Sequence, residues 1–269
     1  MAYAAALDDL LPCYMDTRDE KNFVAHPLFP VCFEWPVVVA LGRQYDRSGL
    51  RADEVARGVH ATHDLIVHRP IRPPERLITR ATVAGIERRK PGAYQVLRLD
   101  TVDSSGAPVA TSYYGSIFRG VDVEGSDNPA SIQNAPAKPS RIDSKPCSES
   151  VVAIGGGLAH TYTECARIYN PIHTDIKVAQ AAGLPGLILH GTATLALAVS
   201  RVVAIEAGGD PTCVARVAGR FNAMVLVGTK IRVRILTREV HGDADFVFFD
   251  VLNQDDAPAI SDGVVGLRR

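Results

Sequence analysis

Apolar and polar residues alternate with a period of two in several stretches of the chain, which is typical of β-strands with one packed face and one wet face. Residues 232–240, Arg-Val-Arg-Ile-Leu-Thr-Arg-Glu-Val, alternate for most of their length. Such stretches, rich in β-branched residues, predict two sets of four strands. The first set covers residues 60–68, 76–88, 93–103 and 109–119, and the second covers residues 212–225, 229–240, 245–253 and 258–268.

One apolar helix is expected before each strand set. The clearer one runs from about Thr192 to Ile205 and ends before the glycine pair at Gly208. Nearly every face of this segment is apolar, which indicates a helix buried on all sides and wrapped by a sheet. The counterpart in the first half is expected from about Pro36 to Tyr45.

The two halves of the chain resemble each other. Residues 100–110 and 250–260 each read as a strand, a polar turn and an Ala-Pro that opens the next strand, at a constant offset of 150. Residues 72–80 loosely resemble residues 226–234, at an offset of 154. Two matches in the same order indicate a tandem duplication. A helix followed by an antiparallel sheet, occurring twice, predicts an α+β double hot-dog fold, with the two sheets joined edge to edge.

The segment between the halves has the composition of a linker. Residues 121–146 are rich in Pro, Ser, Asn and Asp and show no apolar period. A long surface loop is the alternative, although loops of this length are uncommon within one compact domain. The predicted division is an N-terminal hot-dog unit at 1–120, a linker at 121–146 and a C-terminal hot-dog unit at 147–269.

Composition and charge indicate which classes of binding partner the chain is not expected to have. The chain has 269 residues, with 29 Lys and Arg against 30 Asp and Glu, so there is no global basic field and we expect no nucleic-acid partner. The longest apolar run, at 186–205, contains His190 and Arg201, so we expect no membrane span. The five cysteines are odd in number and form no CxxC, which favours reduced thiols, a cytoplasmic protein and no metal site. A strand through His60 and His63 would point them to opposite faces, against a shared metal.

The candidate chemistry lies in residues 162–194. Asn170-Pro171 fixes a turn, and His173 follows on a rigid segment where it can act as a general acid or base, with Asn170 orienting it or its water. His190-Gly191-Thr192 opens the buried helix, whose free backbone N–H groups can bind a developing oxyanion. The structural alternatives are packed core histidines and a glycine that only caps the helix.

This stretch resembles the MaoC-like family of (R)-specific enoyl-CoA hydratases and dehydratases, whose motif is Asp-x-Asn-Pro-(Leu/Ile/Val)-His with a later His-Gly. Residues 170–173 match four motif positions, and His190-Gly191 matches the later element. The resemblance implies a hydro-lyase that acts on an acyl thioester, most simply of coenzyme A, as its small-molecule substrate and without a cofactor. It makes His173 the acid/base and Asn170 its orienting residue. It places Gly191, His190, Thr192 and Ile168 against the substrate, and it makes the first half a degenerate unit that shapes the acyl pocket.

The sequence departs from the family pattern at one position. Ile168 stands where the motif has its Asp, and an isoleucine neither accepts nor donates a proton. Glu164 is a candidate to substitute in part, with a surface glutamate as the alternative, whereas Asp175 is typical of the N-cap of a helix at 176–181.

Three functional hypotheses therefore stay open. The chain is a hydratase or dehydratase; or an enzyme recruited for isomerisation, cyclisation or another elimination; or a non-catalytic subunit that binds acyl thioesters. Because each chain holds two units, a monomer that forms its own pseudo-dimer and a homodimer are both open.

Overall fold

The computed structural model describes residues 1–42, 50–132, 139, 145–242 and 244–269. The strands within these residues are β1 (Gly58–Val67), β2 (Leu77–Arg89), β3 (Gly92–Asp103), β4 (Pro108–Arg119), β5 (Ser148–Ile154), β6 (Val214–Phe221), β7 (Thr229–His241), β8 (Ala244–Leu252) and β9 (Pro258–Arg268). The helices are α1 (Ala2–Ala6), α2 (Pro12–Met15), α3 (Pro30–Gly42), α4 (Ala52–Val55), α5 (Leu158–Ala166), α6 (Ile176–Ala181) and α7 (Gly191–Glu206), with short 3-10 turns η2 (Pro171–His173) and η3 (Pro211–Cys213).

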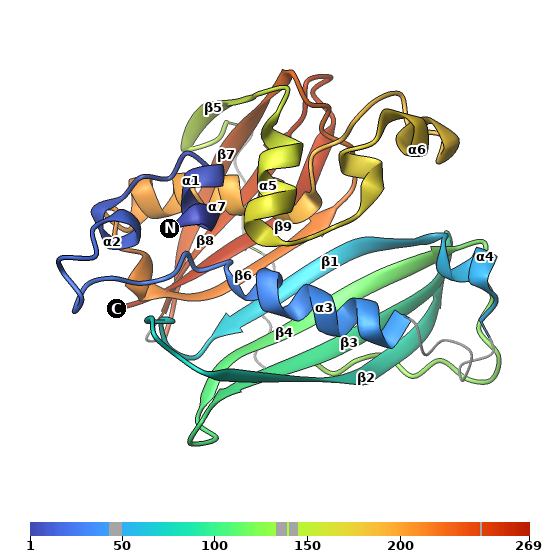
Figure 1. The fold of residues 1–269 in the computed structure, drawn as a ribbon, viewed down its shortest axis with the longest axis horizontal. Helices are drawn as coiled ribbons and strands as arrows, with labels where there is room; N and C mark the ends of the chain where they lie inside the picture. Colours follow the sequence, from blue (N-terminus) through green and yellow to red (C-terminus); the bar gives the residue numbers. More distant parts are fainter. Residues whose placement is uncertain (43–49, 133–138, 140–144, 243) are drawn as a thin grey trace.

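The strands form one antiparallel sheet of nine strands in the described part of the chain, in the order β2-β3-β4-β1-β6-β9-β8-β7-β5 (Figure 1). The order β1-β4-β3-β2 in the first half is repeated as β6-β9-β8-β7 in the second. The halves meet where β1 pairs with β6, from Thr62 opposite Arg220 to Ile66 opposite Arg216. This arrangement confirms the predicted α+β hot-dog architecture with edge-to-edge sheets.

The duplicated turns use the same chemistry. In the first half, the Asp103 Oδ1 accepts hydrogen bonds from the backbone N–H groups of Ser105 and Ala107, at 2.9 and 3.1 Å. In the second half, the Asn253 Oδ1 accepts from those of Asp255 and Ala257, both at 3.0 Å. Each side chain therefore closes the turn ahead of an Ala-Pro pair, and the repeat seen in the sequence has a structural cause.

Helix α7 is the central helix of the second unit, as predicted. Its residues from Thr192 to Val199 are all buried, and it contacts β6, β7, β8 and β9. Helix α3 lies across the sheet of the first unit (Figure 1). Proline is favoured at the first position of a helix, and Pro30 takes that place, so the helix begins before the predicted start and Pro36 lies inside it. Residues 43–45 of the predicted helix lie outside the described residues.

The sequence pattern missed the edge strand β5, which pairs with β7. The seven residues of β5 follow directly on the proline-rich segment, so the alternation is too short to stand out. Asn128, in the predicted linker, exchanges two backbone hydrogen bonds of 2.8 Å with Ile86 of β2. Residues 133–138 and 140–144 of that linker lie outside the described residues, and the domain boundaries stay a prediction.

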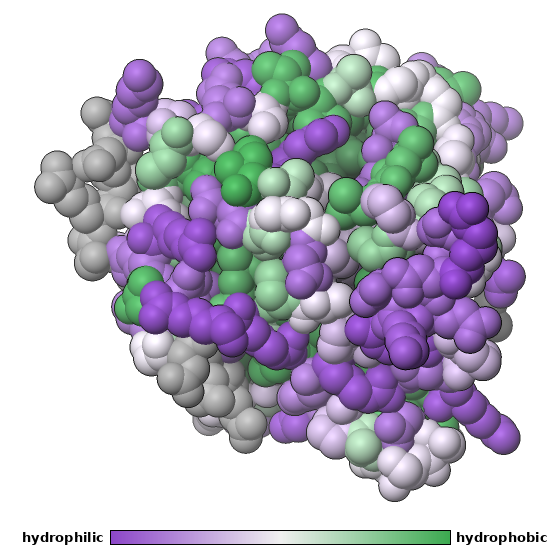
Figure 2. Space-filling view, turned by 90° about the vertical axis from the view of Figure 1, so that its left-hand side faces the viewer, coloured by the Kyte–Doolittle hydropathy of each residue, from purple (hydrophilic) through white to green (hydrophobic). Residues whose placement is uncertain are grey.

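The surface on the side that carries both chain ends is a mosaic of hydrophilic and apolar residues (Figure 2). No helix in the part of the chain that the structure describes is long and apolar enough to cross a lipid bilayer.

Candidate functional site

His173 is held by the turn between α5 and α6. Helix α5 ends at Ala166 and is capped by Arg167, whose φ of 57° is left-handed; Asn170 is then the N-cap of the 3-10 turn η2. The His173 Nδ1 lies 2.8 Å from the carbonyl oxygen of Ile188. Because a carbonyl only accepts, Nδ1 carries the hydrogen, and Nε2 of the neutral ring keeps its lone pair. Burial lowers the pKa of His173 below its usual value, so the ring is neutral at pH 7 and Nε2 can accept a proton.

His190 stacks on His173, with ring centroids 3.7 Å apart and an angle of 26° between the planes. The His190 Nε2 lies 3.2 Å from the Thr163 hydroxyl and 3.3 Å from the Ile168 carbonyl oxygen. The carbonyl therefore accepts the Nε2 hydrogen, and the buried Nδ1 has no hydrogen-bond partner. Burial, with a smaller effect of His173, lowers the pKa of His190 to about 3. His190 is thus a neutral ring that stacks on the His173 ring and restricts its orientation.

The N-terminus of α7 begins beside this pair of rings. His190 is the N-cap and Gly191 the first helical residue. The first N–H groups of a helix have no partner within it, and the helix dipole favours negative charge there. A Cβ at Gly191 would lie 3.0 Å from the ring of Phe221, so a side chain at this position would press on that ring. Because Gly191 has no side chain, the start of α7 lies close to Phe221, and no Cβ covers the backbone of Gly191.

Thr192 is fixed by a chain of hydroxyl groups. Its Oγ1 accepts a hydrogen bond of 3.1 Å from the Tyr162 hydroxyl, which lies 3.3 Å from the hydroxyl of Tyr3. Tyr3 and Tyr162 are fully buried side chains on α1 and α5. Hydrogen bonds from two other helices therefore anchor the first turn of α7 and fix the orientation of its N–H groups.

Ile168 is buried among the main core residues, and only its carbonyl takes part in the polar contacts, through His190. Glu164 lies on the exposed side of α5, where its Oε2 accepts a hydrogen bond of 3.3 Å from the Tyr169 hydroxyl. Helix α5 ends before Ile168, so these two residues are not neighbours on one helix. Asp175 caps α6 as predicted, by accepting from the Lys177 N–H at 2.8 Å.

The structure thus brings His173, His190, the Ile168 carbonyl and the start of α7 together and leaves Glu164 outside this cluster. Asn170 is half-buried, and its backbone carbonyl accepts from the His173 N–H at 3.1 Å. The catalytic roles of His173, Asn170 and Glu164 stay predictions. Sequence reasoning missed the Ile188 carbonyl and the Thr163 hydroxyl, since neither contact has a local sequence signal.

The prediction that His60 and His63 point to opposite faces is wrong. The register of β1 shifts between His60 and Thr62, which brings the two rings to 5.4 Å between centroids. His60 also stacks on Tyr114 at 3.7 Å and meets the edge of Phe221 at 4.7 Å. A β-bulge adds a residue to one strand and so redirects a side chain. Among the described residues, no group of three or more potential metal ligands includes this pair.

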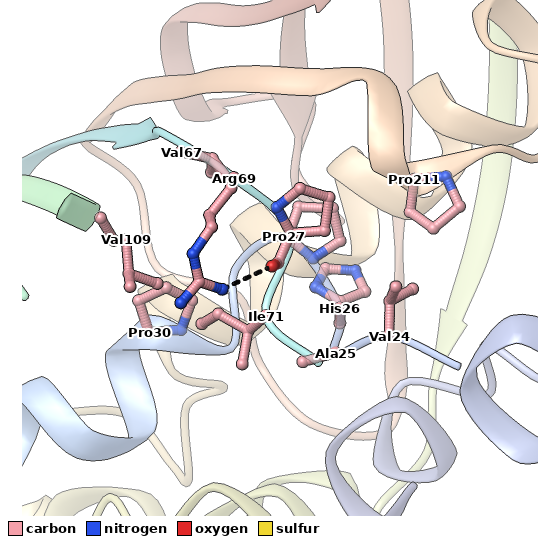
Figure 3. A pocket seen from close by; sticks show the side chains of 12 residues that line it. Val24, Ala25, His26, Pro27, Pro30, Val67, Arg69, Ile71, Val109 and Pro211 are labelled. Carbon is pink, nitrogen blue, oxygen red and sulfur yellow. Dashed lines mark hydrogen bonds between the residues drawn. The ribbon is translucent and has the colours of Figure 1, made fainter. Parts of the chain in front are cut away.

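Two hollows lie away from the His173 cluster. One, of about 10 Å³, lies between the start of α3 and the ends of β1 and β4 (Figure 3). There the Arg69 guanidinium donates to the Pro70 carbonyl at 3.2 Å. The other, of about 260 Å³, lies between residues 7–12 and α7, beside Arg201. Neither hollow is lined by His173, His190 or Gly191.

Comparison with known families divides the chain in two. Residues 141–247 match the MaoC like domain, and residues 1–112 match the FAS1-like dehydratase domain region. The first match contains the whole His173 cluster, and the second contains α3 and most of the first sheet.

Curated relatives span most of the chain. One is the peroxisomal enoyl-CoA hydratase 2 of Arabidopsis thaliana, 28% identical over 231 residues, which covers 78% of this chain and 72% of the relative. Another is the probable enoyl-CoA hydratase 2 of Dictyostelium discoideum, 24% identical, which covers 90% of this chain and 80% of the relative.

Solved structures share the fold. A MaoC-like dehydratase from Phytophthora capsici superimposes with a TM-score of 0.81 at 20% identity, covering 100% of this chain and 90% of the other. A Mycobacterium tuberculosis protein described as a double hotdog fold gives a TM-score of 0.62 at 17% identity, covering 99% of this chain and 90% of the other. On this fold, the chain therefore carries a MaoC-like dehydratase domain in its second half, preceded by a FAS1-like dehydratase region in its first half.

Proposed function

We propose that the chain is a hydro-lyase that adds water to a trans-2-enoyl thioester, or removes it from the 3-hydroxyacyl thioester, with coenzyme A as the thiol. The observation that carries this proposal is the state of His173. Its Nδ1 is tied to the Ile188 carbonyl, its Nε2 keeps a lone pair, and its ring stacks on the N-cap residue of α7.

In the hydration direction, His173 Nε2 takes a proton from water as the water oxygen bonds to Cβ of the substrate. The π electrons of the double bond move to Cα and onto the thioester oxygen. The backbone N–H groups at the start of α7, beginning with Gly191, stabilise that negative charge. The protonated His173 then returns its proton to Cα, so the elements of water are added and the histidine is regenerated.

The side chain at position 168 decides how many groups carry protons. Ile168 offers none, so His173 carries the proton in both steps, and Asn170 orients the water. Carrying the proton in both steps requires a ring that starts neutral, and the burial of His173 supports that state.

Substitution of His173 by Ala tests the assignment. Loss of a general acid/base typically costs about 10²–10⁴-fold in rate, so we expect a fall of at least a hundredfold in kcat/KM for crotonyl-CoA hydration. Glu164→Gln, on the neighbouring helix α5, is the matched control, and we expect it to lose less than tenfold because its carboxylate faces solvent. Unchanged turnover in a folded His173→Ala protein contradicts the proposal.

A second candidate is favoured by the burial of Ile168. An apolar side chain at the motif's acid position suits isomerisation, cyclisation or another elimination that needs a single acid/base. Ile168→Asp separates the two candidates. If the chain is a single-base hydratase, crotonyl-CoA hydration should change by less than tenfold. A gain of a hundredfold would show that the natural reaction is not hydration. Urea unfolding of the variant reports the cost of burying the carboxylate.

We include the compartment and the assembly in the proposal. All five cysteines are free thiols, which supports a reducing compartment such as the cytoplasm. The two units of one chain share a sheet through β1 and β6, which supports a monomer that acts as its own pseudo-dimer. Sedimentation of the purified chain tests the assembly.

A further inference from the structure

Four polar side chains lie inside the first unit, three of them buried and one, His60, partly buried. We call Glu34 on α3, His60 and His63 on β1, and Ser112 on β4 the polar lining. Glu34 and His63 are only 2% and 1% exposed. Four polar atoms of the lining are buried without a hydrogen-bond partner, namely Glu34 Oε2, His60 Nε2 and both ring nitrogens of His63. A buried polar group without a partner is costly, so these four atoms are available to hydrogen-bond to a bound oxygen.

The strand register puts the lining on one face of the sheet. His63 lies opposite Tyr114 on β4 and Gly219 on β6, and Ser112 lies two residues before Tyr114 on the same side. A Cβ at Gly219 would lie 3.4 Å from Leu195 of α7, so this face looks toward the helices and not toward solvent. The Ser112 hydroxyl donates to Glu34 Oε1 at 2.6 Å, which joins α3 to the same face.

The lining is continuous with the start of α7. Phe221 lies against Gly191 on one side, and its ring centroid is 4.7 Å from that of His60 on the other. The ring of His60 in turn lies 5.4 Å from that of His63. The polar lining therefore begins one aromatic ring away from the N–H groups that the proposed function assigns to the thioester carbonyl.

The polar groups of the lining favour a ligand group with an uncharged oxygen atom. Burial keeps the two imidazoles uncharged and lowers the pKa of His63 to about 4. Burial also raises the pKa of Glu34 to about 7, against the Ser112 hydrogen bond, so the carboxyl is protonated in a large part of the molecules at pH 7. Neutral imidazoles and a carboxylic acid both donate and accept hydrogen bonds. They suit a hydroxyl or carbonyl group and offer no cation to an anionic one.

We propose that the acyl group of the substrate carries a hydroxyl or carbonyl oxygen, remote from the thioester, that hydrogen-bonds to Glu34, His60 and His63. This inference rests on the proposed function, because the thioester must lie at the start of α7 for the acyl group to point along the lining. A plain hydrocarbon chain would leave the same four atoms without partners.

The test compares acyl chains that differ by one oxygen. Binding of saturated octanoyl-CoA is measured by calorimetry against octanoyl-CoA bearing a hydroxyl group at each position from C4 to C8, or a keto group at each position from C4 to C7. We expect one position to bind at least tenfold more tightly than the plain chain. His63→Phe and Glu34→Leu should each remove that preference while plain octanoyl-CoA still binds within threefold. His241→Asn, an exposed histidine on β7, is the control that keeps the preference.

The outcomes separate this inference from the proposed function. Hydration of plain enoyl-CoA, combined with equal binding of all oxygenated chains, overturns the inference and leaves the function standing. A preference that survives in both His63→Phe and Glu34→Leu also overturns it. If no turnover occurs but the preference is present and is lost in both variants, the lining stands as a binding site and the hydro-lyase proposal fails. If a His63 variant does not fold, Glu34→Gln and Ser112→Ala provide the same comparison.

Discussion

One hydrogen bond of the His173 imidazole determines which of its two nitrogens can accept a proton. Residues 170–173 and His190-Gly191 were enough to predict that the turn carrying His173 lies beside the start of the buried helix, because proline fixes the turn and the family pattern is local. They gave no information on the protonation of His173, which depends on the carbonyl of Ile188, 15 residues away. A contact between a ring and a distant backbone atom exists only once the fold is formed, so no local pattern reveals it.

The pH dependence of hydration follows from this geometry. The base must be neutral, and burial lowers the pKa of His173 below 6.5, so the neutral form persists to lower pH than for a free histidine. We expect kcat/KM to be flat near pH 7 and to fall only below pH 6.5, as the ring takes up a proton. Initial rates with crotonyl-CoA from pH 4.5 to 8 check this. An acidic limb centred above pH 6.5 would contradict the assignment of the base.

Whole elements were predicted best where the periodic pattern was long. Eight strands and helix α7 were expected from alternation and from the apolar segment that starts near Thr192. Short or interrupted elements were not, and β5 and the start of α3 are the examples. The bulge in β1 had the largest consequence, because a shift of one residue reversed the expected face of His60. Alternation predicts a strand but does not reveal an extra residue within it.

The start of α7 is the element whose geometry we expect to be most sensitive. Gly191→Ala places a methyl group about 3 Å from Phe221, so the ring or the first helical turn must move. The loss of one oxyanion donor typically costs about 10²–10³-fold, and a displaced donor should cost at least tenfold in kcat. Helix propensity favours alanine, so the stability of the protein should change little. Steady-state kinetics and urea unfolding measure the two effects separately.

Gly186→Ala is the matched control, because a Cβ there has nothing within 4 Å. It lies in the same connection, five residues before Gly191. Equal activity of the two variants would mean that the close approach to Phe221 has no part in turnover.

At the scale of the whole molecule, the seam where β1 pairs with β6 joins the unit that contains the His173 cluster to the unit that contains the polar lining. The His173 cluster belongs to the second unit and the polar lining to the first, and Phe221 at the end of β6 contacts both. An ion pair crosses the same seam. The Arg216 guanidinium donates to both carboxylate oxygens of Asp64, at 2.8 and 2.6 Å, and the two side chains are only 6% and 14% exposed. The ion pair therefore ties the sheet of the first unit to the sheet of the second.

Breaking this pair should destabilise both units together. Removal of one partner from a buried ion pair typically costs about 3–5 kcal/mol, because the remaining charge is buried without its counterion. We expect Asp64→Ala to lower the free energy of unfolding by about 3 kcal/mol, in a single transition seen both by Trp35 fluorescence and by far-UV circular dichroism.

Asp250→Ala, which breaks the Arg234 pair inside the second unit, is the control. Its loss of stability should be smaller because that pair is more exposed. The double substitution Asp64→Leu with Arg216→Met should recover most of the stability, since it leaves no buried charge. Two separate transitions in Asp64→Ala would instead mean that the units fold independently and that the site depends on their docking alone.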